Sequence, residues 1–246
     1  MYRDLVELAT FPSLVCAPDD PAQLVPGAGV VILLHGLGSE KEDLLDEVER
    51  LGRAGLIAIA IDAVGHGQRR SDELEELILG SPEEEERAFY QVIRQTALEL
   101  PALLDALTAR AWSTSGRVAL LGIGMGAFIA LRARTLDPRV EVMITISGSP
   151  EWTRHTGESP ARQLEAFWPA ALLLVHGEQD DVVAPGGGLD FVERLRPLYQ
   201  DDPDRLRRVT FPGVGHIFPP ATWERVMEQG ERFIRRYLPE AATSIH

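Results

Sequence analysis

Short apolar runs return six times along the chain, each followed by a longer stretch of mixed polar and apolar residues. Within a run the hydrophobicity is continuous and does not alternate, which is typical of strands covered on both faces, as in a parallel sheet. We therefore expect six such strands, at residues 29–34, 56–62, 117–121, 140–146, 171–176 and 207–211.

Between these runs the apolar positions follow helical spacing. Ser81 followed by Pro82 and four glutamates is a helix start, with the acids on a solvated face near the positive end of the helix dipole. Pro101 lies inside the same segment and is expected to bend or divide that helix. The helices are expected over residues 41–55, 82–110, 127–136, 189–199 and 223–238.

Strand and helix alternate from residue 29 onward, a pattern that calls for right-handed crossovers and a mostly parallel sheet with helices on both faces. Residues 1–28 carry turn markers at Pro18–Pro21 and Pro26–Gly27, which indicate an entry hairpin or edge strands. No linker, repeat or low-complexity tract interrupts the pattern. We expect one α/β domain over 1–246.

Composition narrows the range of partners. The chain has 246 residues, 45% of them hydrophobic, and a net charge of −14, which argues against nucleic acid and anionic membrane surfaces as partners. Cys16 is the only cysteine, so no intramolecular disulfide forms, and it is expected to be a small buried residue. The N-terminus lacks a signal-peptide pattern and no apolar run approaches ~20 residues, so the expected location is cytoplasmic.

A glycine-rich turn joins the third apolar run to the helix after it. Its sequence is Gly122-Ile123-Gly124-Met125-Gly126, and the outer glycines allow the helix to leave the strand with almost no loop. The turn resembles the nucleophile elbow of the α/β-hydrolases, written G-x-S-x-G. The position of the serine is occupied by Gly124.

Further motifs follow the other strands in the order found in that family. They are His35-Gly36-Leu37-Gly38-Ser39, Asp62 to Gly67, His176-Gly177-Glu178-Gln179-Asp180, and Gly215-His216. From about residue 29 to 238 the chain resembles an α/β-hydrolase of the esterase and dienelactone-hydrolase-like type. The resemblance implies that fold, with a short lid over about 148–168.

The resemblance also implies roles for single positions. Gly124 stands at the nucleophile position, Asp180 at the acid and His216 at the base, while the backbone amides of Leu37 and Met125 would form an oxyanion hole. We predict that His216 lies within hydrogen-bond reach of Asp180, with Gly124 facing its other ring nitrogen across an empty space.

Other candidate residues have structural interpretations. Asp181 is a less favoured substitute for the acid. His35 is expected to be oriented by backbone hydrogen bonds, His66 to shape the floor of the site, and Asp62 to cap its strand. His176 is expected to be structural.

In the polar segment, Trp152 and His155 are candidates for ligand contact, with a surface position as the equal alternative. His246, the last residue, has no evident role.

Glycine at position 124 leaves the function open. Losing a triad nucleophile costs on the order of a million-fold in rate. Ser39 and Ser147 are able to approach the site from neighbouring strand ends, and His216 with Asp180 is able to activate a water. The resemblance implies hydrolysis of small carboxylic esters or thioesters. The alternative is a non-catalytic ligand-binding or scaffold protein of the same fold.

The expected partner is a small ester-like ligand, with no metal and no organic cofactor. A remote alternative is a dinucleotide-binding oxidoreductase, since Gly122, Gly124 and Ala127 also match G-x-G-x-x-A. That fingerprint needs an acid about twenty positions on, at the end of the next strand. The next strand ends at Ser147 without one.

Overall fold

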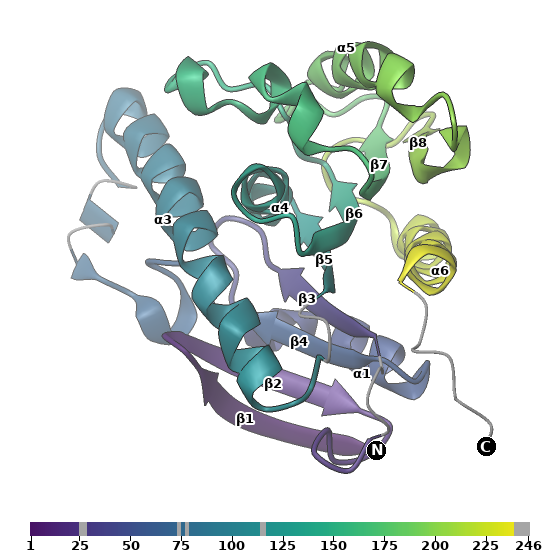
Figure 1. Cartoon of the computed structure of the whole chain (residues 1–246). Helices are drawn as coiled ribbons and strands as arrows, with labels where there is room; N and C mark the ends of the chain where they lie inside the picture. Colours follow the sequence, from purple (N-terminus) through teal and green to yellow (C-terminus); the bar gives the residue numbers. More distant parts are fainter. Residues whose placement is uncertain (25–28, 73–74, 77–78, 114–116, 239–246) are drawn as a thin grey trace.

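The sheet runs through the whole molecule. The computed structural model describes residues 1–24, 29–72, 75–76, 79–113 and 117–238, and these residues form one eight-stranded sheet in the order β1-β2-β4-β3-β5-β6-β7-β8 (Figure 1). β1 and β2 form an antiparallel hairpin, β2 pairs antiparallel with β4, and all remaining pairs are parallel. The strands are β1 (Tyr2–Leu8), β2 (Phe11–Ala17), β3 (Val30–Leu34), β4 (Ile57–Ile61), β5 (Val118–Ile123), β6 (Val140–Ile146), β7 (Ala171–Gly177) and β8 (Leu206–Phe211).

Helices cover both faces of this sheet (Figure 1). One layer holds α3, α4 and α5, and the other holds α1 and α6, as the two separate apolar cores indicate. The helices are α1 (Leu45–Arg53), α3 (Pro82–Ala109), α4 (Met125–Leu136), α5 (Gly186–Leu195) and α6 (Pro220–Tyr237). Short 3-10 turns include η1 (Lys41–Leu44), η2 (Gly67–Arg69), η3 (Thr156–Glu158), η4 (Pro160–Arg162), η5 (Leu164–Ala166), η6 (Arg196–Tyr199) and η7 (Pro203–Arg205).

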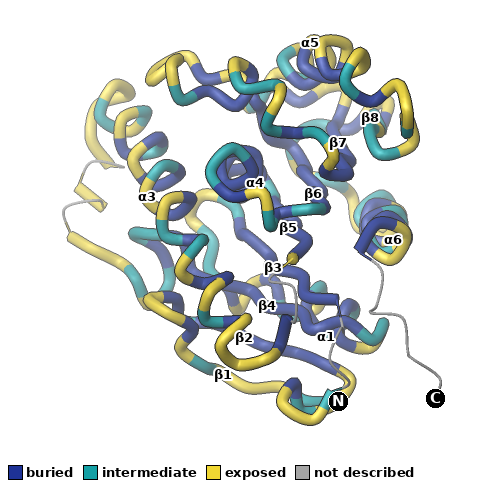
Figure 2. Tube along the Cα trace, viewed as in Figure 1, coloured by how far each residue is buried: buried dark blue, intermediate teal, exposed yellow. Residues whose placement is uncertain are grey.

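The central strands are buried along their whole length (Figure 2). In β3, Val30, Ile32 and Leu34 face the α3–α4 core, whereas Val31 and Leu33 face the α1–α6 core. Side chains of a strand alternate between faces, so a strand with a core on each side must be apolar throughout. This is why the apolar runs in the sequence are continuous.

The predicted elements are present, with shifted ends. β5 continues two residues past its predicted end, to Ile123, and α4 begins at Met125, so strand and helix are separated by Gly124 alone. The entry hairpin is confirmed, and Cys16 is fully buried in its second strand. Its turn lies at Ala9 and Thr10 and not at the predicted markers, because Pro18–Pro21 follow β2 and Pro26–Gly27 lie outside the described residues. The expectation that α3 would divide was wrong, because the helix continues through Pro101 to Ala109. Burial against α4 and the β-sheet supplies the stability that one missing hydrogen bond removes.

The start of α3 follows the predicted capping pattern. Ser81 and Glu84 form a reciprocal capping box, and Pro82 is the first helical residue. Among the described residues, no helix is both long and apolar enough to cross a membrane. His246 lies outside the described residues.

Candidate functional site

The carboxyl ends of the parallel strands open into a pocket of about 770 Å³. We call it the His216 pocket. In open α/β sheets, ligands bind at this edge. Its lining comes from the loops after β3, β5, β6, β7 and β8, together with η1, α1, α3, α4 and α6. The residues used below include Leu37, Gly124, Met125, Ser147 and His216.

The turn between β5 and α4 is very tight. A Cβ on Gly126 would lie 2.0 Å from the carbonyl oxygen of Leu34, and one on Gly122 would lie 2.2 Å from the carbonyl oxygen of Gly126. Only glycine permits such contact, so the two outer glycines let α4 pack directly on the sheet. The turn presents Gly124 at φ 53° and ψ −117°, outside all three regions that L-residues ordinarily occupy.

Asp180 and His216 meet at the edge of the pocket. The Nδ1 of His216 lies 2.9 Å from Oδ2 and 3.1 Å from Oδ1 of Asp180, so the predicted hydrogen bond is present. Asp180 is buried, and it also accepts hydrogen bonds from the amides of Val182 and Val183 at 3.0 and 2.8 Å. Burial alone would raise the pKa of Asp180, but these hydrogen bonds and the imidazole hold it below its ordinary value. The alternative acid, Asp181, is exposed.

The other ring nitrogen of His216 faces Gly124. A Cβ placed on Gly124 would lie 3.8 Å from Nε2 of His216 and 3.8 Å from Cα of Gly36, both ordinary contact distances. The predicted gap between glycine and imidazole is therefore present. It has the size of a small side chain, and a hydroxyl one bond beyond that Cβ would come within hydrogen-bond reach of Nε2.

Two backbone amides border this gap. Met125 is the first residue of α4, where helix amides have no intrahelical acceptor and the helix dipole is positive. The loop after β3 brings Leu37 to the same pocket, and within the described chain its amide donates no hydrogen bond. Both amides are thus free to donate a hydrogen bond to an oxygen atom of a ligand.

Two histidines fix the shape of the Leu37 loop. The Nδ1 of His35 lies 2.8 Å from the carbonyl oxygen of Gly36, and its Nε2 accepts from the amide of Ala63 at 3.1 Å. The Nε2 of His66 accepts from the amide of Gly38 at 3.1 Å. Burial lowers the pKa of His35, which keeps the ring neutral and suited to this backbone role. Both predicted structural roles agree with these contacts.

Beneath this loop lies a buried ion pair. Lys41 and Asp62 are both fully buried, with Nζ 2.8 Å from Oδ2. Asp62 also accepts from the amides of Lys41 and Gln68, each at 2.9 Å. Burial lowers the pKa of Lys41, but bonds to Asp62 and Glu42 outweigh it and raise the pKa overall. The predicted cap Asp62 therefore joins the loops after β3 and β4 into one unit.

The two candidate substitute serines also line the pocket. The hydroxyl of Ser39 donates to Asp43 at 2.7 Å. Ser147, at φ 52°, donates to the carbonyl oxygen of His216 at 3.3 Å. Each hydroxyl proton is directed to a partner other than the imidazole, so neither arrangement is that of an activated nucleophile.

The segment 148–168 gives a mixed outcome. Trp152 is 4% exposed, so a surface position was wrong for it, whereas His155 is exposed. Neither lines the His216 pocket; the segment contributes Glu151 and Thr153 there. Trp152 packs against Tyr90 of α3, with ring centroids 5.2 Å apart, and this long-range contact explains its burial. His176 contacts Asp180 at 3.0 Å and the carbonyl oxygen of Val183 at 2.8 Å.

Sequence reasoning missed the contribution of α3 to the pocket. Glu86, Phe89 and Tyr90 line it, and Glu86 bonds Arg154 and the hydroxyl of Thr153. The glutamate run at 83–86 was interpreted as a solvated face. The available signal was Phe89 and Tyr90, three and four residues after Glu86, which pack into the apolar core.

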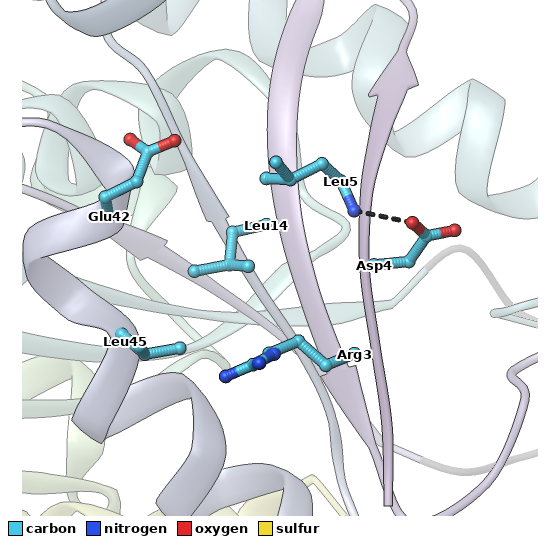
Figure 3. A pocket seen from close by; sticks show the side chains of 6 residues that line it. All are labelled: Arg3, Asp4, Leu5, Leu14, Glu42 and Leu45. Carbon is cyan, nitrogen blue, oxygen red and sulfur yellow. Dashed lines mark hydrogen bonds between the residues drawn. The ribbon is translucent and has the colours of Figure 1, made fainter.

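A second hollow, of about 480 Å³, lies between the entry hairpin and the first helical segment after β3 (Figure 3). Its polar groups come from Arg3, Asp4 and Glu42, and Arg3 is paired with Glu49 at 3.1 Å. Its lining, as far as the structure describes the chain, includes no histidine, serine or cysteine. It therefore offers neither a nucleophile nor a base for catalysis.

Comparison with known families agrees with this fold. Residues 26–168 match the family described as "Serine aminopeptidase, S33", and residues 141–240 match the prolyl oligopeptidase family. The chain is similar to the esterase YjfP of Escherichia coli, with 28% identity over 235 residues that cover 85% of this chain and 88% of the relative.

Two solved structures share the fold across nearly the whole chain. TT1662 from Thermus thermophilus has a TM-score of 0.75 and 23% identity, covering 98% of this chain and 99% of its own. A dienelactone hydrolase from Anabaena variabilis has a TM-score of 0.69 and 22% identity, covering 96% and 97%.

Proposed function

Because the chain belongs to the serine aminopeptidase S33 family of the α/β-hydrolases, we propose that its His216 pocket binds a neutral carboxylic ester or thioester. We further propose that the chain forms no covalent acyl intermediate at position 124. The esterase-like character is common to the family. The identity of the ligand and the lack of covalent turnover are the proposal.

The observation that carries it is the gap between Gly124 and His216. Gly124 has the strained backbone conformation expected of an elbow, and the imidazole of His216 bonds a buried carboxylate, but position 124 has no side-chain atom to attack a carbonyl. A hydrolase site without its nucleophile still has the groups that orient an ester. Binding and oxyanion stabilisation persist in such sites when the triad is removed.

The amides of Leu37 and Met125 would bind the carbonyl group of the ester ligand. In this proposal they donate to the carbonyl oxygen of the ligand, as an oxyanion hole does. Asp180 holds His216 in the tautomer whose Nε2 accepts a hydrogen bond, so the imidazole is available to a hydroxyl or water at the gap.

The charge of the pocket argues for a neutral ligand over a free carboxylate. Among the described residues that line it, four are carboxylates and none is a lysine or arginine; the acids are Asp43, Glu47, Glu86 and Glu151. Glu86 and Glu151 pair with Arg154 and Arg194, whereas Asp43 and Glu47 form no ion pair with a described residue. The carboxylate of a ligand would therefore be repelled in this partly enclosed space. Apolar walls from Phe89, Phe128 and Trp223 suit an acyl or alcohol group.

The volume also bears on ligand size. At about 770 Å³ the pocket falls in the range of drug-sized ligands, so it accepts groups larger than a short acyl chain. In the proposal, segment 148–168 serves as a short lid, since Glu151 and Thr153 reach the pocket wall. One domain then carries the whole site.

The test compares the chain with Gly124→Ser on p-nitrophenyl and thioester substrates of increasing acyl length. We expect the chain itself to bind the intact esters in calorimetry without hydrolysing them. Gly124→Ser should hydrolyse them at least about a hundredfold faster than Gly124→Ala, a small part of what a triad nucleophile contributes. The alanine variant is the matched control, because it carries the same backbone strain without the hydroxyl.

A second control is Gly124→Ser combined with His216→Ala, which should lose the gained activity. Hydrolysis by the unchanged chain that His216→Ala abolishes would contradict the proposal and indicate a water activated by His216. An inactive Gly124→Ser variant together with absent ester binding would overturn the ester assignment.

A further inference from the structure

A separate pocket lies between β8 and the C-terminal half of α6. It has a volume of about 390 Å³, many times the ~30 Å³ share of one liquid water. We call it the arginine pocket; its walls include Arg207, Gln229, Arg232, Phe233, Arg236 and Tyr237. It opens near the start of β7 and β8, at the amino ends of the strands, whereas His216 follows the carboxyl end of β8.

The charge here is opposite to that of the chain. Arg207, Arg232 and Arg236 line the pocket, although the whole chain has a net charge of −14. Within the part of the chain that the structure describes, no carboxylate lines the arginine pocket. Arg236 pairs with Asp204 at 2.7 Å, but Arg207 and Arg232 form no ion pair with a described residue. Two guanidinium groups are therefore available to an anion.

Tyr237 adds an unsatisfied donor. Its side chain is 8% exposed, and its hydroxyl is buried without a hydrogen-bond partner among the described residues. The guanidinium groups of Arg205 and Arg236 stack over its ring, with centroid distances of 5.0 and 5.1 Å. Burial raises the pKa of Tyr237, so the hydroxyl keeps its proton at neutral pH. Buried polar groups are normally satisfied, so this hydroxyl is an unused donor on a residue that lines the pocket.

From these groups we propose that the arginine pocket is a binding site for a phosphate group carried by a small molecule. Guanidinium groups form paired hydrogen bonds with phosphate oxygens, and a phosphate dianion matches the two unpaired charges better than one carboxylate does. The aromatic floor of Phe233 and Tyr237 provides an apolar contact for the organic part of the ligand. The strongly negative chain repels extended polyanions, which favours a small ligand.

The competing explanation is protection of an exposed sheet edge. β8 is the last strand of the sheet, and charged side chains on edge strands prevent pairing with other chains. Edge protection requires charged side chains at any position on β8, whereas phosphate binding requires positively charged side chains that line the pocket. Arg208, the next residue on the same strand, does not line the pocket, and so it separates the two explanations.

The test is calorimetric titration of the full chain with pyrophosphate at physiological ionic strength. We expect saturable binding at one site with a Kd below about 1 mM. Arg207→Ala with Arg232→Ala should weaken it at least about tenfold, because charge-assisted hydrogen bonds are lost. Both side chains are exposed, so the fold is retained. Tyr237→Phe keeps the ring and should weaken binding several-fold.

Arg208→Ala is the matched control and should leave the Kd unchanged. Equal weakening by Arg208→Ala would overturn the proposal in favour of general edge charge. Absence of saturable binding to the unchanged chain would also overturn it. So would tighter binding to anionic vesicles or DNA than to pyrophosphate, because the surface would then be an interface for a larger polyanion.

Discussion

Gly124 shows how one backbone conformation constrains one residue. Its φ of 53° and ψ of −117° strain any residue that has a Cβ, although space for that Cβ exists. We expect Gly124→Ala to lower the free energy of unfolding by about 1–3 kcal/mol in urea titration. Gly186→Ala is the control, since a Cβ there meets nothing within 4 Å and φ is not positive. Equal losses at the two positions would contradict a conformational origin.

Ionisation of Asp180 makes the stability of the protein depend on pH. Its pKa in the folded protein lies below the ordinary value of 3.8, so the stabilisation from its ionised form is complete above that value. It is lost as the pH falls through the lowered folded pKa. We expect Asp180→Asn to be less stable than the unchanged chain at pH 6, with a difference that shrinks below about pH 4.

Urea titrations across this pH range measure the effect. Asp181→Asn removes the same charge from an exposed neighbour and serves as the control. A stability difference for Asp180→Asn that stays constant down to pH 2 would show that the loss is steric and independent of ionisation.

The Asp180–His216 contact was predicted through the resemblance of the motifs to those of the α/β-hydrolases. The structure gives its physical basis: both residues follow parallel strands, whose ends meet at one edge of the sheet. It could not predict the burial of Trp152 or the pocket wall from α3. These depend on packing between segments more than sixty residues apart, such as Tyr90 with Trp152 and Thr153. Local pattern carries no information on such pairs.

At the scale of elements, the loops after β3 and β4 act together through Lys41 and Asp62. Replacing Lys41 with methionine would leave Asp62 as an unpaired buried charge. We expect Lys41→Met to lower the free energy of unfolding by about 3–5 kcal/mol, the usual effect of breaking a buried pair. Arg53→Met breaks the exposed pair with Glu49 and should cost about 0.5 kcal/mol or less.

Chemical denaturation of both variants measures this difference. Similar losses in the two would mean that the buried pair contributes no more than a surface one. In that case the backbone amides of Lys41 and Gln68 alone would hold Asp62 in place.

Element types followed from the sequence, while their ends required the structure. β5 and α4 meet at a single residue because Gly122 and Gly126 permit backbone contact, which brings both element ends closer than hydrophobic spacing indicates. α3 remains whole through Pro101 because its inner face is buried along its length. In both cases tertiary packing outweighs local propensity.

For the whole molecule, the alternation of strand and helix predicted a mostly parallel sheet between two helical layers, and this is confirmed. The hydrophobic pattern could not predict the strand order, in which β4 lies between β2 and β3, because continuous apolar runs do not specify which strands are neighbours.

The two ends of the sheet also differ in charge. Carboxylates line the His216 pocket at one end, and arginines line the pocket at the other.

Lys41 is the only lysine in the 246 residues, and it is fully buried. A lysine-specific endoprotease therefore has one target bond, after Lys41, and the folded chain conceals it. We expect the native chain to resist this protease and to be cut into 1–41 and 42–246 at a rate that follows its unfolded fraction in urea. An arginine-specific protease, with exposed sites such as Arg3, is the control. Rapid cutting without urea would show that the segment opens locally. Otherwise, a single proteolytic cut reports the unfolding of the entire molecule.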